Sequence, residues 1–188
     1  MPQPSALHRF AHSATTRDAA RLLSSPRCKH IYLDTGSNLG VQIRKIYEPL
    51  KYWSATVEPH FAKYFGEAPR CAAVGSIGTH IEPNPRHFAR HGALERRLGA
   101  AGAKVAFVHA AAAVGDGEAK LWMPAGSAKD KNEDWGATIA VGGVPPRGLK
   151  AVTTPLLNLS SLLLAVGARP RAARGRVVMK LVRVLCTL

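Results

Sequence analysis

The sequence lacks an apolar run long enough to cross a bilayer. Its best candidate, residues 156–166, is interrupted by Asn158, Ser160 and Ser161, and it is much shorter than the roughly 18–20 residues that a spanning helix needs. With 46% hydrophobic and 20% charged residues over 188 positions, the composition is typical of a globular chain of one domain. We therefore expect no membrane span.

Cysteine is scarce, and no two cysteines lie close together in sequence. Cys28, Cys71 and Cys186 form no CxxC pair and no zinc-binding spacing. This predicts a reducing intracellular setting, the cytoplasm by default.

The first 30 residues hold five Lys or Arg against one acid, with several Ser and Thr. That composition is typical of an organellar transit peptide, and the alternative is a basic N-terminal helix.

Acidic residues are missing from the C-terminal third. No Asp or Glu follows Asp134, whereas eight Lys or Arg do, and these supply more than half of the net charge of +14. Such an excess attracts nucleic-acid phosphates, with an affinity that depends on salt. It forms no stripe interleaved with aromatic residues, so we expect non-specific attraction and no specific nucleic-acid partner.

Predicted strands and helices alternate along the chain. The expected strands are 30–33, 71–77 and 104–109, an extended piece at 118–123, and 176–181; the expected helices are 14–24, 39–50, 84–98 and 156–166. We interpret residues 48–71 as an insertion and residues 124–150 as a long irregular segment. A turn is expected at 115–117. This order predicts an α/β fold with a parallel sheet covered by helices on both faces.

Two of the expected helices have specific signals. Leu39, Ile43, Ile46 and Leu50 form an apolar stripe at helical spacing. The second helix begins at Asn84-Pro85, an N-cap side chain followed by a fixed φ. It places Phe88, Leu94 and Leu98 inward and stops at Gly99 and Gly102.

A glycine-rich segment follows the first strand, at the sheet edge where ligands of parallel sheets bind. Its glycines permit unusual backbone conformations and close approach of a ligand, and the amides at the helix start can bind polar groups of a nucleotide-like ligand. The alternative is a strand-to-helix turn without a ligand. The candidate binding residues are Asp34, Gly36, Ser37, Asn38 and Gly40.

Glu82 follows the second predicted strand and precedes the helix start at Asn84. A carboxylate at this place can accept hydrogen bonds from both hydroxyls of a ribose, so Glu82 and Asn84 join the candidate site. The alternative is that Glu82 stabilises the positive helix start. Because 48 residues separate Asp34 from Glu82, the insertion must loop out to bring them together.

These motifs together resemble the FkbM-type family of S-adenosylmethionine (SAM) methyltransferases. The similarity covers most of residues 22–181, and it is carried by segments 33–45, 81–87, 107–117, 135–138 and 177–181. The resemblance implies a Rossmann-like methyltransferase domain at 22–188 after a basic extension at 1–21. It also implies SAM as cofactor, with Asp34, Gly36 and Asn38 along its methionine part, Glu82 at the ribose, and Ala112 and Ala113 near the adenine.

The resemblance ends at residue 181. Where the family continues with Asp-hydrophobic-Glu-Gly, this chain reads Val182-Arg183-Val184-Leu185. We therefore expect a sheet that is incomplete after the fourth core strand and an open edge that favours self-association. The expected activity is O-methylation of a sugar or small-metabolite hydroxyl, with no catalytic base assigned; the alternative is a non-catalytic remnant or interaction module that binds SAM weakly.

One further pair of residues has a metal-binding spacing. His87 and His91 stand at i and i+4 on the predicted helix, a spacing that suits zinc, but no third ligand is evident. We expect both histidines to be solvated and no metal to be bound.

Overall fold

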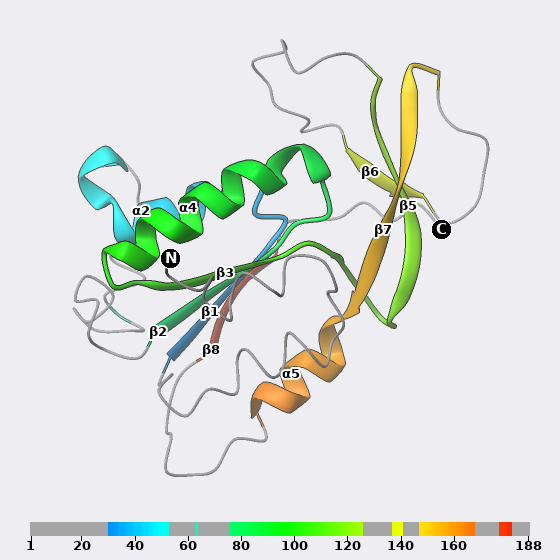
Figure 1. Cartoon of the computed structure of the whole chain (residues 1–188). Helices are drawn as coiled ribbons and strands as arrows, with labels where there is room; N and C mark the ends of the chain where they lie inside the picture. Colours follow the sequence, from blue (N-terminus) through cyan, green and yellow to red (C-terminus); the bar gives the residue numbers. More distant parts are fainter. Residues whose placement is uncertain are drawn as a thin grey trace, which may run out of the picture.

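The computed structural model describes residues 30–52, 63, 76–125, 137–140, 147–167 and 177–181 (Figure 1). The helix predicted at 14–24 and the 48–71 insertion, apart from residues 48–52 and 63, lie outside these residues. In the described part the chain forms a mixed α/β fold with two sheets. The predicted α/β class is thereby confirmed. No helix within the described ranges is long and apolar enough to cross a membrane.

The first sheet is parallel and has the strand order β3-β2-β1-β8. Its strands are β1 (His30–Thr35), β2 (Ser76–Ile81), β3 (Lys104–Val108) and β8 (Val177–Leu181). β1 lies in the middle, with Asp34 opposite His80 of β2 and Lys180 of β8. The strand order reverses at β1, which is the place in an open parallel sheet where a crevice for ligands arises.

Helices cover both faces of the parallel sheet, as predicted (Figure 1). On one face, α2 (Val41–Tyr47) and α4 (Phe88–Ala100) bury Ile43 and Leu94 against Tyr32 and Phe107. On the other face, α5 (Leu159–Gly167) buries Leu162 in a cluster of aliphatic residues from β1, β2, β3 and β7: Ile31, Leu33, Ile81, Val108 and Leu157.

The second sheet has the order β4-β7-β5-β6 and is mostly antiparallel. It consists of β4 (Ala111–Ala113), β5 (Gly117–Pro124), β6 (Thr138–Ala140) and β7 (Leu149–Asn158). Only two residues, His109 and Ala110, separate β3 from β4, so the chain passes directly from one sheet to the other. This sheet was not predicted as such: only the extended piece at 118–123 and the turn at 115–117 are confirmed.

The helix predicted at 156–166 begins later than expected. Leu156 to Asn158 end β7, where Leu156 and Leu157 lie opposite Ala111 and Ala112 of β4. The side-chain oxygen Oδ1 of Asn158 then accepts a hydrogen bond from Ser161 N at 2.9 Å, which is the contact of a helix N-cap. An apolar run alone does not distinguish strand from helix, and here the pairing with β4 decides.

The helix predicted at 39–50 is shorter than its apolar stripe. α2 ends at Tyr47, and Pro49–Tyr52 form a 3-10 turn (η2) in which Leu50 is 91% exposed. Glu48 leaves the helical conformation because the residue before a proline disfavours it. The expectation that Leu50 continues the buried stripe is therefore wrong, whereas Ile43 and Ile46 are buried as predicted.

The predicted start of α4 is confirmed. Asn84 Oδ1 accepts a hydrogen bond from Arg86 N at 3.0 Å, and the first turn, Pro85–His87, is a 3-10 turn (η4) that leads into α4. Leu94 and Leu98 are buried. Gly102, with φ +85°, follows the end of the helix, the left-handed conformation that commonly terminates helices.

Candidate functional site

The glycine-rich loop between β1 and α2 folds over the end of β2. Gly36 N and Ser37 N both donate to the carbonyl oxygen of Ile81, at 2.9 and 3.4 Å. Gly36, Asn38 and Gly40 all have positive φ, of 72°, 49° and 72°. Glycine adopts this conformation without strain, and asparagine is one of the few other residues that tolerate it. The loop is therefore built from the residue types that its backbone needs.

Gly40 is also a point of close contact with α4 and β3. A Cβ atom at this position would lie 2.8 Å from Leu94 Cδ2 and 3.0 Å from Phe107 Cζ. Both distances are shorter than normal packing permits. A glycine at position 40 therefore lets the start of α2 lie close to α4 and β3.

Glu82 joins the loop to the end of β2. Its Oε2 accepts a hydrogen bond from Asn38 N at 2.7 Å, and its Oε1 accepts one from Asn84 N at 3.0 Å. The side chain is 7% exposed. Burial raises the pKa of Glu82 above its ordinary value, the hydrogen bonds from Asn84 and Asn38 oppose this, and the charge of Asp34 adds to it. Glu82 and the loop therefore lie together, despite their separation in sequence.

Asp34, near the end of β1, and Ser37, in the loop, are both buried, at 0% and 3% exposure. Burial, with a further contribution from the charge of Asp34, raises the pKa of the neighbouring Tyr32 hydroxyl. Among the described residues, the Ser37 hydroxyl has no hydrogen-bond partner. A buried hydroxyl without a partner carries a free-energy cost, which a polar ligand at the loop would remove.

Three buried histidines lie close to this group: His87 in η4, His91 in α4 and His109 directly after β3. His91 is fully buried, and its Nε2 lies 2.5 Å from the Asn38 carbonyl oxygen; because a carbonyl only accepts, this nitrogen carries the hydrogen. His91 Nδ1 lies 3.4 Å from His109 Nε2, and His87 Nε2 lies 3.2 Å from Asn84 Nδ2. The rings of His91 and His109 stack on Phe107 and Phe88, with centroids 4.0 and 3.5 Å apart.

The expectation that His87 and His91 are solvated is wrong. They are 4% and 0% exposed. The signal was present in the sequence, because His91, Leu94 and Leu98 follow one another at i, i+3 and i+7 and so share the inward face of the helix. In the described part of the chain, no group of three or more His, Cys, Asp or Glu is arranged to hold a metal ion.

The remaining predicted binding residues lie in two different parts of the fold. Asn84 is buried beside Glu82, where it caps the helix start and contacts His87. Ala112 and Ala113 lie in β4, opposite Leu157 and Asn158 of β7. Ala112 packs against the core cluster on the α5 side of the parallel sheet. The loop, Glu82 and Asn84 thus form one connected group, and the two alanines belong to the second sheet.

Comparisons with protein-family models, with curated proteins and with solved structures give no match to this chain. What the site can do is therefore argued from its own geometry. It combines backbone amides at a helix start, two buried carboxylates and a buried hydroxyl at the point where the strand order reverses. This donor and acceptor set suits a neutral or zwitterionic ligand with hydroxyl, ammonium and carboxylate groups.

Proposed function

We propose that the chain binds SAM at the carboxyl ends of β1 and β2 and is a SAM-dependent methyltransferase acting on a hydroxyl of a sugar or small metabolite. The observation that carries the proposal is the Asn38 N to Glu82 Oε2 hydrogen bond of 2.7 Å, which unites the glycine-rich loop and the acid across 44 residues of sequence. The strand order β3-β2-β1-β8 and the helices on both faces support a Rossmann-like fold for the domain.

The residues present fit the polar groups of SAM. Asp34 would accept from the methionine ammonium, and the amides of the first turn of α2 would bind its carboxylate, because the loop amides of Gly36, Ser37, Asn38 and Gly40 already donate inside the protein. Glu82 would accept from the ribose hydroxyls, because each carboxylate oxygen can accept more than the one backbone hydrogen bond it has. Bound SAM supplies the methyl group; the chain's contribution is to hold it in line with an acceptor hydroxyl.

Isothermal titration of the full chain with SAM tests this proposal, and the absence of binding at millimolar SAM would overturn it. Glu82→Gln is expected to weaken SAM binding about tenfold, because the amide nitrogen that replaces one carboxylate oxygen cannot accept. Glu118→Gln, at an exposed position on β5, is the matched control and should leave the affinity unchanged. Thermal melts of both variants establish that they are folded.

A second candidate is a module that binds SAM weakly without turnover. The hydrogen bonding of Glu82 favours it. Both oxygens of Glu82 already accept backbone hydrogen bonds inside the protein, as expected of a residue that only holds the loop. Adenosine and 2′,3′-dideoxyadenosine separate the two roles. If Glu82 binds ribose, wild type prefers adenosine and Glu82→Gln loses that preference; if Glu82 only holds the loop, the variant weakens both ligands equally.

Two further measurements, methyl transfer and the association state of the chain, test the remaining parts of the proposal. Transfer of a labelled methyl group to a hydroxyl acceptor would exclude the module without turnover. The open-edge prediction concerns β8, which ends the strand order of the described parallel sheet. Light scattering would detect the self-association that an exposed strand edge favours.

A further inference from the structure

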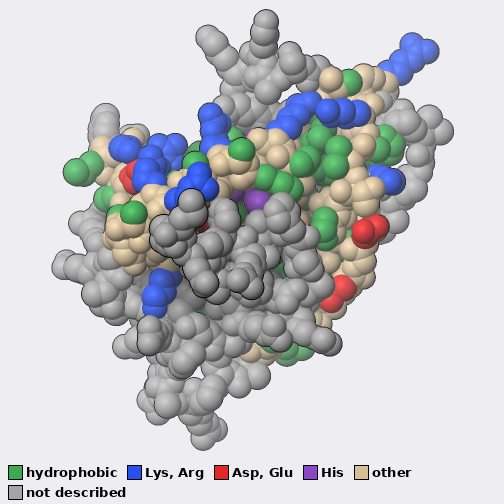
Figure 2. All heavy atoms as spheres, viewed as in Figure 1, with side chains coloured by type: hydrophobic (Ala, Val, Ile, Leu, Met, Phe, Trp, Pro, Cys, Tyr) green, Lys and Arg blue, Asp and Glu red, His purple; other side chains and the backbone are tan. Residues whose placement is uncertain are grey.

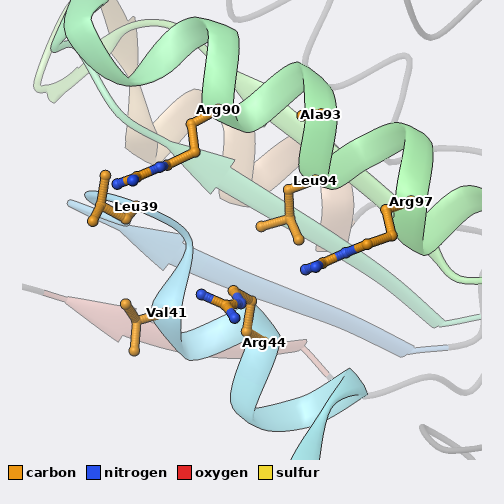
Figure 3. A pocket seen from close by; sticks show the side chains of 7 residues that line it. All are labelled: Leu39, Val41, Arg44, Arg90, Ala93, Leu94 and Arg97. Carbon is orange, nitrogen blue, oxygen red and sulfur yellow. The ribbon is translucent and has the colours of Figure 1, made fainter. Parts of the chain in front are cut away.

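A second feature lies outside the loop, in a cleft between α2 and α4. Its volume is about 470 Å³, and its floor is apolar, formed by Leu39, Val41 and Leu94. Three arginines, Arg44, Arg90 and Arg97, line its sides (Figure 3). Clefts of this size hold small organic ligands. Leu39 and Val41 flank Gly40, so the cleft runs along the outer side of the same loop.

The arginines gather at the two ends of the cleft. In Figure 3, Arg97 extends from α4 toward α2, on which Arg44 lies, while Arg90 reaches toward Leu39. Arg90 and Arg97 are seven residues apart on α4, which places them about two helical turns, or roughly 10 Å, from one another on one face. A ligand that spans the cleft therefore meets cations at both ends.

Within the described part of the chain, the carboxylate of Glu48 pairs with two of the three cleft arginines. Glu48 Oε2 contacts Arg44 Nε at 2.8 Å and Arg97 at 3.0 Å, and its Oε1 contacts Lys51 Nζ at 2.8 Å. Burial raises the pKa of Glu48, but the hydrogen bonds from Arg44 and Lys51 and the charges of Arg97 and Arg44 outweigh burial, so the pKa is lowered. The one negative charge of Glu48 thus faces three cations, those of Arg44, Lys51 and Arg97. Figure 2 shows Lys and Arg side chains gathered over the region of α2 and α4.

We propose that this cleft binds a small phosphate ester with an apolar or planar body. Guanidinium groups present planar pairs of donors that match phosphate oxygens, and the apolar floor accommodates the rest of the ligand. A cleft of about 470 Å³ with cations from two helices suits a ligand that carries its charge on one compact group, whereas a nucleic-acid backbone is tracked by an extended basic face. The inference stands on the cleft alone and does not rest on SAM binding.

Titration of the full chain with phenyl phosphate and with inorganic phosphate tests the proposal. Phenyl phosphate is expected to bind more tightly, because only it contacts the apolar floor. Arg90→Met and Arg97→Met should each weaken its binding about tenfold. Arg96→Met removes the same charge from an exposed position of α4 that does not line the cleft, and it should change the affinity less than twofold.

Glu48→Gln gives a change of opposite sign. It removes the carboxylate that competes for Arg44 and Arg97 and should tighten phenyl phosphate binding several-fold, an outcome that impaired folding does not produce. The proposal is overturned if phenyl phosphate does not bind, or if Arg96→Met weakens it as much as the cleft variants do. It is also overturned if a short single-stranded oligonucleotide binds far more tightly and all arginine variants weaken it alike, which would indicate an extended nucleic-acid surface.

Discussion

Buried polar side chains distinguish the two sheets of the molecule. Among the described residues, those at the carboxyl ends of the parallel strands and on α4 include Asp34, Glu82, Asn84 and three histidines, whereas the second sheet buries Thr154 within an apolar core. The first region is held by hydrogen bonds that cross between β1, β2 and α4. The second is held by strand pairing and aliphatic packing.

The comparison indicates where the molecule is specialised. Buried polar groups lower stability unless each one finds a partner, and a connected network fixes a single geometry when it does. The loop end of the parallel sheet contains such buried polar groups, whereas the second sheet is held by apolar contacts. The loop end is therefore the better candidate for a binding site. If that is correct, equivalent substitutions in the two regions should have unequal effects.

The largest difference in the loss of folding stability is expected between alanine variants of two glycines with positive φ. Gly40 and Gly148 have φ of 72° and 78°, but only Gly40 has neighbours within 4 Å of an added Cβ. Alanine at either position costs about 1–2 kcal/mol for the left-handed conformation. At Gly40 a further cost of about 1–3 kcal/mol arises from crowding against Leu94 and Phe107. Urea denaturation should show Gly40→Ala to be less stable than Gly148→Ala by about 2 kcal/mol; equal losses would mean that the loop is not tightly packed.

A smaller difference is expected for two asparagine caps. Asn84 is buried and contacts both Glu82 and His87, whereas Asn158 caps α5 from a partly exposed position. Loss of a cap costs about 1 kcal/mol. Asn84→Ala should cost about 2 kcal/mol in total, because it also deprives buried His87 of a partner, and Asn158→Ala about 1 kcal/mol. Thermal unfolding of the two variants measures this, and a larger loss at Asn158 would contradict the proposed order.

The parallel half of the fold was predictable from local signals. The strand at β1, the cap at Asn84 and the alternation with helices all appear in the sequence, because each rests on neighbouring residues. That Glu82 lies near the end of β1 was expected from sheet topology, since the ends of adjacent parallel strands meet, but its hydrogen bond from Asn38 N was not predicted. The spacing of His91 from Leu94 and Leu98 predicts that His91 faces inward. No local pattern predicts that it donates a hydrogen bond to the Asn38 carbonyl oxygen.

The second sheet was less predictable because its strands depend on distant partners. β7 runs from Leu149 to Asn158. Its last residues, from Leu156 on, were predicted to begin an apolar helix. Its conformation is decided by pairing with β5 and β4, more than 20 residues earlier in the sequence. The arginine cleft was missed for a similar reason: Arg44 and Arg97 belong to different helices, and only the fold brings them to Glu48.

The smallest expected effect concerns Glu95 and the edge of the parallel sheet. Glu95 Oε1 accepts a hydrogen bond from Phe107 N of the edge strand β3, at 2.6 Å. Burial raises the pKa of Glu95 to about 7, although the hydrogen bond from Phe107 and the charge of Arg96 oppose the increase. The folded state therefore binds an extra proton between the ordinary pKa of about 4.5 and 7, so this group's contribution to stability is present at low pH and is lost as pH rises through that window.

Glu95→Gln isolates this contribution, because glutamine keeps an acceptor for Phe107 N and cannot lose a proton. Between pH 4.5 and 7 the wild type should lose about 1 kcal/mol relative to the variant, a value reduced from the full shift because the side chain is partly exposed. Urea denaturation across this range measures the difference between the two curves. Glu118→Gln, on the exposed side of the second sheet, should follow the wild-type curve. Parallel curves for wild type and Glu95→Gln would show that the edge of the parallel sheet does not depend on this carboxyl, and the contrast between the two sheets would then rest on the loop and its histidines.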